Sequence, residues 1–154
     1  MVRPALALSA WLALAMPTNA QTADCPVTED LTSCTRILAC IGNEGVWFDG
    51  RSFGRGYGTL AGHTSDGALC TGRWTSSTVL GFGQAEVTCD DGFAVTVLFY
   101  YQEPYTGTAL GRGLGSDGRM VRSWSGLHVL DYLGDDESGA GASLPCGEAP
   151  IPIS

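Results

Sequence analysis

The sequence predicts a mainly β domain, an antiparallel meander of about three β-hairpin repeats with one N-terminal α-helix, bridged by disulfides. The first observation is that the dipeptide Asp-Gly recurs at Asp66-Gly67, Asp91-Gly92 and Asp117-Gly118, at spacings of 25 and 26 residues. Asp-Gly is a strong hairpin signal, because both central residues of the tight two-residue turn need positive φ. The second is the glycine-rich sequence around these turns, and the third is an even number of cysteines.

The first twenty residues have the form of a secretory signal peptide. Arg3 gives a positive start, and residues 5–16 form an apolar run that is too short to remain as a membrane anchor. Small residues then lead to Ala20, where we expect cleavage, with Ala23 as the alternative. The expected location is therefore secreted or periplasmic, without membrane insertion.

An α-helix is predicted over about residues 29–41. Thr28 suits the N-cap and Gly42 suits the stop. The apolar residues between them recur at helical spacing, namely Leu31, Cys34, Ile37, Leu38 and Ile41. The helix would open a single β-rich domain over residues 21–133.

The strongest predicted strand covers residues 93–101. Alternation places Phe93, Val95, Val97, Phe99 and Tyr101 on one wholly apolar face, which should point to the core. Residues 134–154 are rich in glycine, proline and acids and predict a flexible tail that is pinned by Cys146.

All six cysteines follow the leader, and an even number in an exported chain predicts a disulfide framework. They are Cys25, Cys34, Cys40, Cys70, Cys89 and Cys146. Fifteen full pairings are possible by combinatorics. Cys34 and Cys40 would be too far apart on a helix to bond each other, so each should tie the helix to the sheet or to the tail. The sequence contains no Cys-x-x-Cys pair of the kind that binds zinc, and we expect no metal or cofactor.

Charge and motifs exclude several classes of function. The net charge is −8 and no residue is lysine, which argues against a nucleic-acid partner. Motifs of the common hydrolases and of phosphate-binding loops are absent from the sequence. An acidic cluster within residues 131–137 is either a solvated loop or a calcium site, although its spacing fits no EF-hand.

The segment 45–74 resembles the MORN repeat, whose units run through Gly-x-Trp, a Gly-x-Gly strand, an Asp-Gly turn and a return strand ending in Gly-x-Trp. The matching residues are Gly45, Trp47, Asp49, Gly50, Gly54, Gly56, Thr59, Leu60, Asp66, Gly67, Gly72 and Trp74. Two departures are a few extra residues before Asp66 and a cysteine, Cys70, where the repeat usually has tyrosine. The resemblance implies a β-hairpin scaffold that contacts proteins or lipids, with no catalytic residues.

The candidate binding surface consists of aromatic and arginine side chains around the second and third hairpins, namely Tyr100, Tyr105, Arg112, Arg119 and Arg122. Aromatic residues contribute much contact energy in interfaces, and arginine binds acidic groups. Tyr100 and Tyr105 should lie outside the core, from strand alternation and the chain break at Pro104. We therefore expect an exported binding or structural module that contacts a protein or an envelope polymer through its sheet.

Two alternatives use other residues. A small secreted hydrolase could act through a carboxylate pair such as Glu86 and Glu103, or through His63 with its neighbours Ser65 and Asp66. A secreted enzyme inhibitor would insert a loop such as residues 102–110 into its target.

Overall fold

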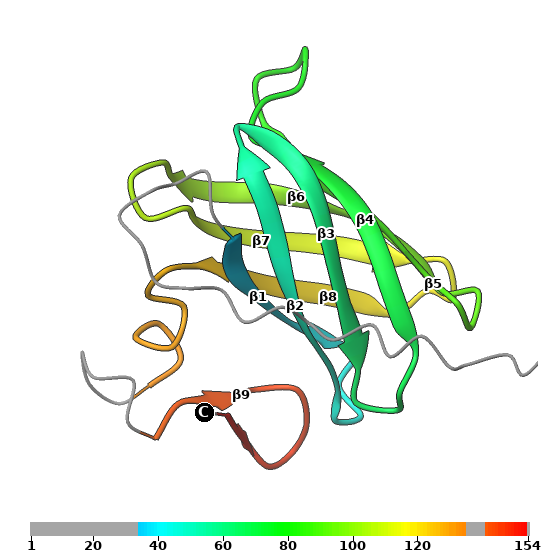
Figure 1. Ribbon diagram of the computed structural model, residues 1–154. Helices are drawn as coiled ribbons and strands as arrows, with labels where there is room; N and C mark the ends of the chain where they lie inside the picture. The colour runs from blue at the N-terminus through cyan, green and yellow to red at the C-terminus, as the bar shows by residue number, and fades with distance from the viewer. Residues whose placement is uncertain (1–33, 135–140, 154) are drawn as a thin grey trace, which may run out of the picture.

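A computed structural model describes residues 34–134 and 141–153 of the chain. Eight antiparallel strands form a closed barrel in which each strand pairs with its neighbours in the sequence (Figure 1). The strands are β1 Cys34–Ile41, β2 Val46–Arg55, β3 Tyr57–Thr64, β4 Leu69–Thr75, β5 Gly83–Cys89, β6 Ala94–Glu103, β7 Thr108–Gly115 and β8 Met120–Gly126. Pairing of β1 with β8 closes the barrel, so none of the eight strands has a free edge.

The predicted fold class was wrong in two respects, since the sheet is closed and the predicted helix is a strand. Residues 34–41 form β1; residues 29–33 lie outside the described part, as does the predicted signal peptide. The interior side of β1 carries Ile37, Ala39 and Ile41, and its outer side is buried under the C-terminal segment. A strand that is buried on both sides has an almost continuous apolar sequence, which cannot be distinguished from a buried helix by periodicity.

The Asp-Gly dipeptides do connect antiparallel strands, as predicted, but through a different turn. Gly67, Gly92 and Gly118 have φ near +90°, whereas no other residue type in the described chain has positive φ. The N–H of each glycine donates to the carbonyl three residues earlier. These are therefore three-residue loops in which a type I turn precedes a left-handed glycine. Because one repeat spans two strands, all three loops lie at the same end of the barrel.

Glycines on the barrel wall make room for phenylalanine rings. A Cβ added at Gly50 or Gly62 would lie 2.5 Å from the Phe48 ring. The same holds for Gly115, where the distance to the Phe93 ring would be 2.4 Å. The glycine-rich strands therefore let aromatic side chains lie flat against neighbouring strands inside the barrel.

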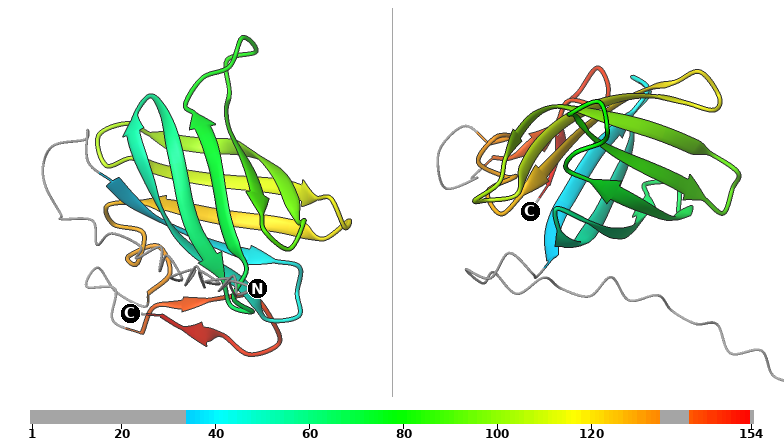
Figure 2. Two further views of the ribbon diagram at one scale, coloured as in Figure 1. Left: turned by 45° about the vertical axis from the view of Figure 1, so that its right-hand side comes forward. Right: turned by 90° about the horizontal axis from the view of Figure 1, so that it is seen from above.

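A second apolar cluster lies outside the barrel. It joins Leu38 and Cys40 on β1 to Val129, Leu144 and Cys146 of the C-terminal segment. Two short strands, β9 Ser143–Leu144 and β10 Ile151–Pro152, form a separate hairpin in this segment, next to the barrel in Figures 1 and 2. The segment that was expected to be a tail thus supplies the cover that buries the outer face of β1.

Two disulfides join described residues, and both are consistent with an oxidising, extracellular environment. Cys40–Cys146 ties β1 to the C-terminal segment, which agrees with the expectation that Cys40 bonds outside its own element. Cys70–Cys89 joins β4 to β5 at a directly paired position. Cys34 is also disulfide-bonded.

Asp49 links two arginines on the outer side of β1 and β2. Its carboxylate lies 2.7 Å from Arg36 Nη2 and 2.9 Å from Arg51 Nη1, and all three side chains are about four-fifths buried. Burial by itself would raise the pKa of Asp49. The hydrogen bonds and charges of Arg36, and then of Arg51, outweigh it and hold the pKa below its usual range.

We expect Asp49→Asn to lower the free energy of unfolding at pH 7 by about 2 kcal/mol, a typical value for hydrogen bonds to a charged group. Because the folded pKa is lower than the unfolded one, this stabilisation is complete above about pH 4 and disappears on further acidification. Urea denaturation at pH 7 and pH 3 should therefore show a difference from the native protein that shrinks at pH 3. The control is Glu86→Gln, which removes the charge of an exposed carboxylate. The hydrogen-bond partner of Glu86 is the amide of Gln84. An equal difference at both pH values would contradict the assignment.

Candidate ligand-binding cavity

The barrel encloses a cavity of about 480 Å³ that is lined by the inward side chains of all eight strands. Its inner part is apolar and buried, with Phe48, Phe93, Val95 and Val121 on the wall beside the Cys70–Cys89 disulfide. We call this the closed end; the Asp-Gly loops lie here. The opposite end, the mouth, carries the β2–β3, β4–β5 and β6–β7 connections.

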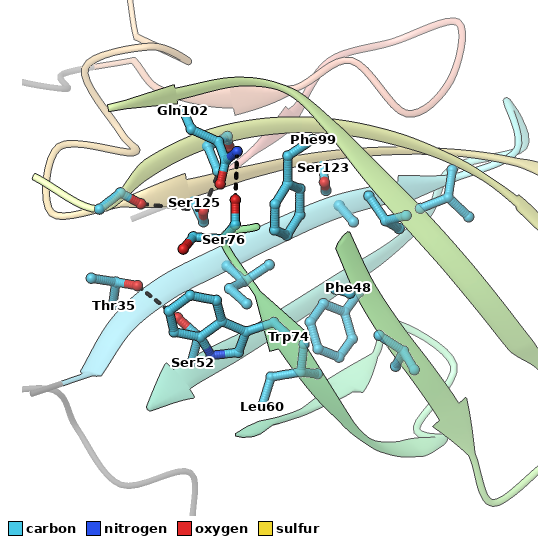
Figure 3. Close-up of a pocket in the computed structure, with 18 of the residues that line it drawn as sticks. Thr35, Phe48, Ser52, Leu60, Trp74, Ser76, Phe99, Gln102, Ser123 and Ser125 are labelled. Carbon is cyan, nitrogen blue, oxygen red and sulfur yellow. Dashed lines mark hydrogen bonds between the residues drawn. The ribbon is translucent and has the colours of Figure 1, made fainter. Parts of the chain in front are cut away.

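The mouth is lined by polar groups, several of which are exposed. Thr35 Oγ1 and Ser52 Oγ form a hydrogen bond of 2.7 Å across β1 and β2. Gln102 Nε2 donates to the carbonyl of Ser76 at 3.1 Å, which joins β6 to the β4–β5 connection (Figure 3). That connection projects beyond the mouth in Figure 1, and its tip exposes Val79 and Leu80. A ligand that enters from the mouth would therefore pass a polar rim before it reaches the apolar interior.

Aromatic rings form part of the cavity wall. The rings of Phe48, Trp74 and Phe99, from β2, β4 and β6, border the same space in Figure 3. The Trp74 indole donates its N–H to the carbonyl of Phe53 at 3.1 Å, so the polar atom of this side chain is satisfied. Trp74 therefore offers an apolar ring face to the cavity and a fluorescent reporter of its occupancy.

A β-bulge decides which side chain of β6 faces the mouth. The pairing register of β6 with β7 shifts between Phe99 and Tyr101, so the alternation of inward and outward side chains along β6 breaks there. Tyr101 was predicted to share the core face, but it is 44% exposed, and Gln102 lines the cavity in its place. The bulge thus exchanges an aromatic residue for an amide at the mouth.

The residues of the predicted binding surface lie outside the cavity and do not form one patch. Tyr100 and Tyr105 are 63% and 81% exposed, as predicted, and the Arg112 guanidinium lies 5.5 Å from the Tyr100 ring centre. Arg119, at the closed end, pairs with Asp117 and lies over Phe93. Arg122 donates to the carbonyl of Pro145 in the C-terminal segment. Of the five, the structure brings together Tyr100, Arg112 and Arg122, because the two arginines are directly opposite each other on β7 and β8.

The residues of the hydrolase alternative have separate structural roles. Ser65 accepts a hydrogen bond from the N–H of Trp47, and Asp66 accepts one from the Thr64 hydroxyl. The Thr64 hydrogen bond is the main cause that lowers the pKa of Asp66. His63 lies on β3 with its ring edge-on to Trp47, at 6.1 Å between ring centres.

The two glutamates of the same alternative lie apart. Glu86 pairs in register with Thr96 on β6, whereas Glu103 ends that strand, roughly 20 Å further along at strand spacing. Glu103 accepts hydrogen bonds from the side chain of Thr106 and from the N–H groups of Tyr105 and Thr106, which lower its pKa in that order. Its carboxylate therefore caps the β6–β7 turn.

The acidic cluster is only partly described. Asp131 lies 3.3 Å from His128 Nδ1, and residues 135–137 are outside the described part. Within residues 34–134 and 141–153, no group of three or more histidine, cysteine, aspartate or glutamate side chains is placed to hold a metal ion.

Sequence reasoning missed the cavity as a site. The available signal was the small side chains at alternate positions of several strands, such as Ala39, Ala85 and Ser123, which leave the interior unfilled. This signal carries meaning only once the sheet is known to close, because the same residues on an open sheet enclose nothing.

Together, the closed fold and this cavity define a small antiparallel β-barrel with an apolar interior and a polar mouth. Searches of protein-family models, of curated proteins and of solved structures each returned no match. The resemblance of residues 45–74 to the MORN repeat thus stays a prediction. No helix in the described residues is long and apolar enough to cross a membrane.

Proposed function

We propose that the protein binds a small, largely apolar molecule inside its barrel. The observation that supports this most is the cavity of about 480 Å³, bounded by apolar side chains and open at one end. Small-molecule sites typically have volumes of about 300 to 1,000 Å³, apolar walls and a few polar groups that fix orientation. The hydroxyl and amide groups of the mouth would supply those polar contacts.

An interior filled by its own side chains is the alternative for a barrel of this size. Eight strands enclose a space just wide enough to be filled by side chains or to hold one small ligand. Here several inward positions carry small residues, namely Ala39, Ala85, Ala109, Ser123 and Ser125. Protein interiors are normally packed without large voids, because empty space forfeits dispersion contacts. A bound ligand would fill this space and supply the missing dispersion contacts.

The cellular setting of this proposal is the periplasm or the extracellular medium. The predicted leader and the disulfides support it. In that setting the barrel would take up, carry or sense its ligand.

Contact with a protein or an envelope polymer through the outer sheet is the second candidate function. The exposed apolar side chains on the outer face of β6, β7 and β8 favour it, since Leu98, Tyr100, Leu114 and Met120 are 44% to 63% exposed. Exposed apolar patches mark interaction sites when they are contiguous and large. This candidate becomes the leading one if the cavity binds nothing.

Binding of the uncharged dye N-phenylnaphthylamine tests the cavity. We expect its fluorescence to rise to saturation at one dye per protein, while Trp74 emission falls by energy transfer. Ala85→Trp should weaken binding by about tenfold or more, because filling the space removes the burial of at least two methylene-sized groups. The matched control is Thr88→Trp, an exposed position on the same strand.

Two results would contradict this proposal. One is a native protein that gives no saturable dye signal while circular dichroism shows a folded barrel. The other is an equal loss of affinity in Ala85→Trp and Thr88→Trp, which would place the dye on the outer surface.

A further inference from the structure

We propose that the ligand carries an uncharged hydrogen-bonding group, a hydroxyl or a carbonyl, which the Ser123 hydroxyl binds inside the barrel. This inference rests on the proposed function and specifies the chemistry of its ligand. It starts from a polar side chain in an apolar place. Ser123 lies on β8, is 9% exposed and lines the cavity (Figure 3).

The Ser123 hydroxyl has no hydrogen-bond partner among the described residues. The other two buried polar side chains that line the cavity in the described part are paired: Ser52 with Thr35, and Thr108 with Thr106. No polar side-chain atom that is fully sealed within the described part lacks a partner, so the Ser123 hydroxyl reaches the cavity space. A ligand group at this place would gain a hydrogen bond that no described protein group takes up.

The neighbours of Ser123 keep the space at its hydroxyl free. In the strand register it pairs with Ala39 on β1 and with Gly111 on β7, so both flanking side chains are minimal. A Cβ added at Gly111 would lie 2.7 Å from Ser123 Oγ and 2.5 Å from Val97. Glycine at 111 therefore leaves room at the hydroxyl, and the wall around it is otherwise apolar.

The charge of the wall favours an uncharged group. The charged residues that line the cavity are Arg55 and Glu103, both at the mouth, and the Glu103 carboxylate is occupied by the β6–β7 turn. A carboxylate or ammonium at the depth of Ser123 would be buried without an opposite charge, which strongly disfavours its binding. A ligand hydroxyl or carbonyl needs one hydrogen bond there, which serine can donate or accept.

The test compares octanol, methyl heptyl ketone, octane and octanoate as competitors of N-phenylnaphthylamine. With the native protein we expect octanol and the ketone to bind more tightly than octane, and octanoate more weakly than octanol. Ser123→Ala should weaken octanol and the ketone by about five- to tenfold, the loss expected for one net hydrogen bond, and leave octane unchanged. Ser116→Ala, an exposed serine of the β7–β8 loop, should change none of the four.

Ser123→Thr is a second variant, because it keeps the hydroxyl on a β-branched side chain that suits a strand. It should keep the preference for octanol over octane even if its overall affinity falls. Equal competition by octanol and octane in the native protein, or an unchanged preference in Ser123→Ala, would overturn the inference and leave the proposed function intact. Tighter binding of octanoate than of octanol would overturn it as well. If neither the dye nor any competitor binds, the proposed function itself fails.

Discussion

Replacing Cys40 and Cys146 together by alanine is expected to lower the free energy of unfolding by about 4 to 5 kcal/mol. The bridge spans 106 residues of sequence, and the chain-entropy model gives about 4.7 kcal/mol for a closed loop of 100 residues. Both cysteines are fully buried in the outer apolar cluster, so the bridge also holds the C-terminal segment against β1. The double variant is used because a single one would leave a reactive thiol.

Urea denaturation measures this loss, and hydrogen exchange locates it. Backbone amides of β9 and β10 should exchange faster in the variant, while those of β3 to β6 change less because they do not contact the cluster. The comparison is the Cys70→Ala, Cys89→Ala protein, whose bridge spans 19 residues and should contribute about 3 kcal/mol. A larger loss in the Cys70 and Cys89 variant would contradict the assignment of Cys40–Cys146 as the stronger constraint.

Gly58→Ala is expected to cost more than about 3 kcal/mol, or to prevent folding, because the barrel leaves no space for a methyl group there. A Cβ at this position would lie 1.7 Å from the carbonyl oxygen of Phe53, 2.8 Å from its carbonyl carbon and 3.0 Å from Trp74 Nε1. Backbone on the paired strand β2 cannot move away without breaking the β2–β3 pairing at Gly54 and Gly58. The same substitution would displace Trp74 from the cavity wall.

Two other glycines separate this clash from the general effect of adding a side chain. Gly67→Ala meets nothing within 4 Å but has φ +95°, so it should cost about 1 to 2 kcal/mol of backbone strain. Gly147→Ala has its nearest atom at 3.4 Å and no positive φ, so it should be within about 1 kcal/mol of the native protein. Thermal and urea denaturation should show the largest loss of stability for Gly58→Ala, a smaller loss for Gly67→Ala and the smallest for Gly147→Ala. A Gly58→Ala protein as stable as Gly67→Ala would contradict the close strand approach.

Local signals of the sequence predicted the hairpins well. A left-handed glycine after a polar residue specifies a tight connection within four or five residues, whatever the rest of the chain does. Gly67, Gly92 and Gly118 therefore lie in turns, and the repeat of 25 to 26 residues follows from two strands per hairpin. Alternation along Val95, Val97 and Phe99 likewise predicted the inward face of β6 up to the bulge.

The closure of the barrel was decided by contacts between distant parts of the chain. β1 pairs with β8 from Arg36 with Gly126 to Ile41 with Val121, and no local pattern in residues 34–41 indicates that partner. Burial of its outer face depends on Leu144 and Cys146, more than 100 residues away, so the strand carried a helical apolar spacing by coincidence.

The sequence by itself determined the turns, the presence of disulfides and the exposure of Tyr100 and Tyr105, and it predicts export. These properties depend on composition, on short spacing or on the conformational freedom of single residues. Only the tertiary structure decided that the sheet closes, that small residues then leave a cavity, and that Ser123 faces it with no partner among the described residues. The reason is that a cavity belongs to no single segment: its walls come from eight strands, and each one looks like ordinary core when it is considered alone.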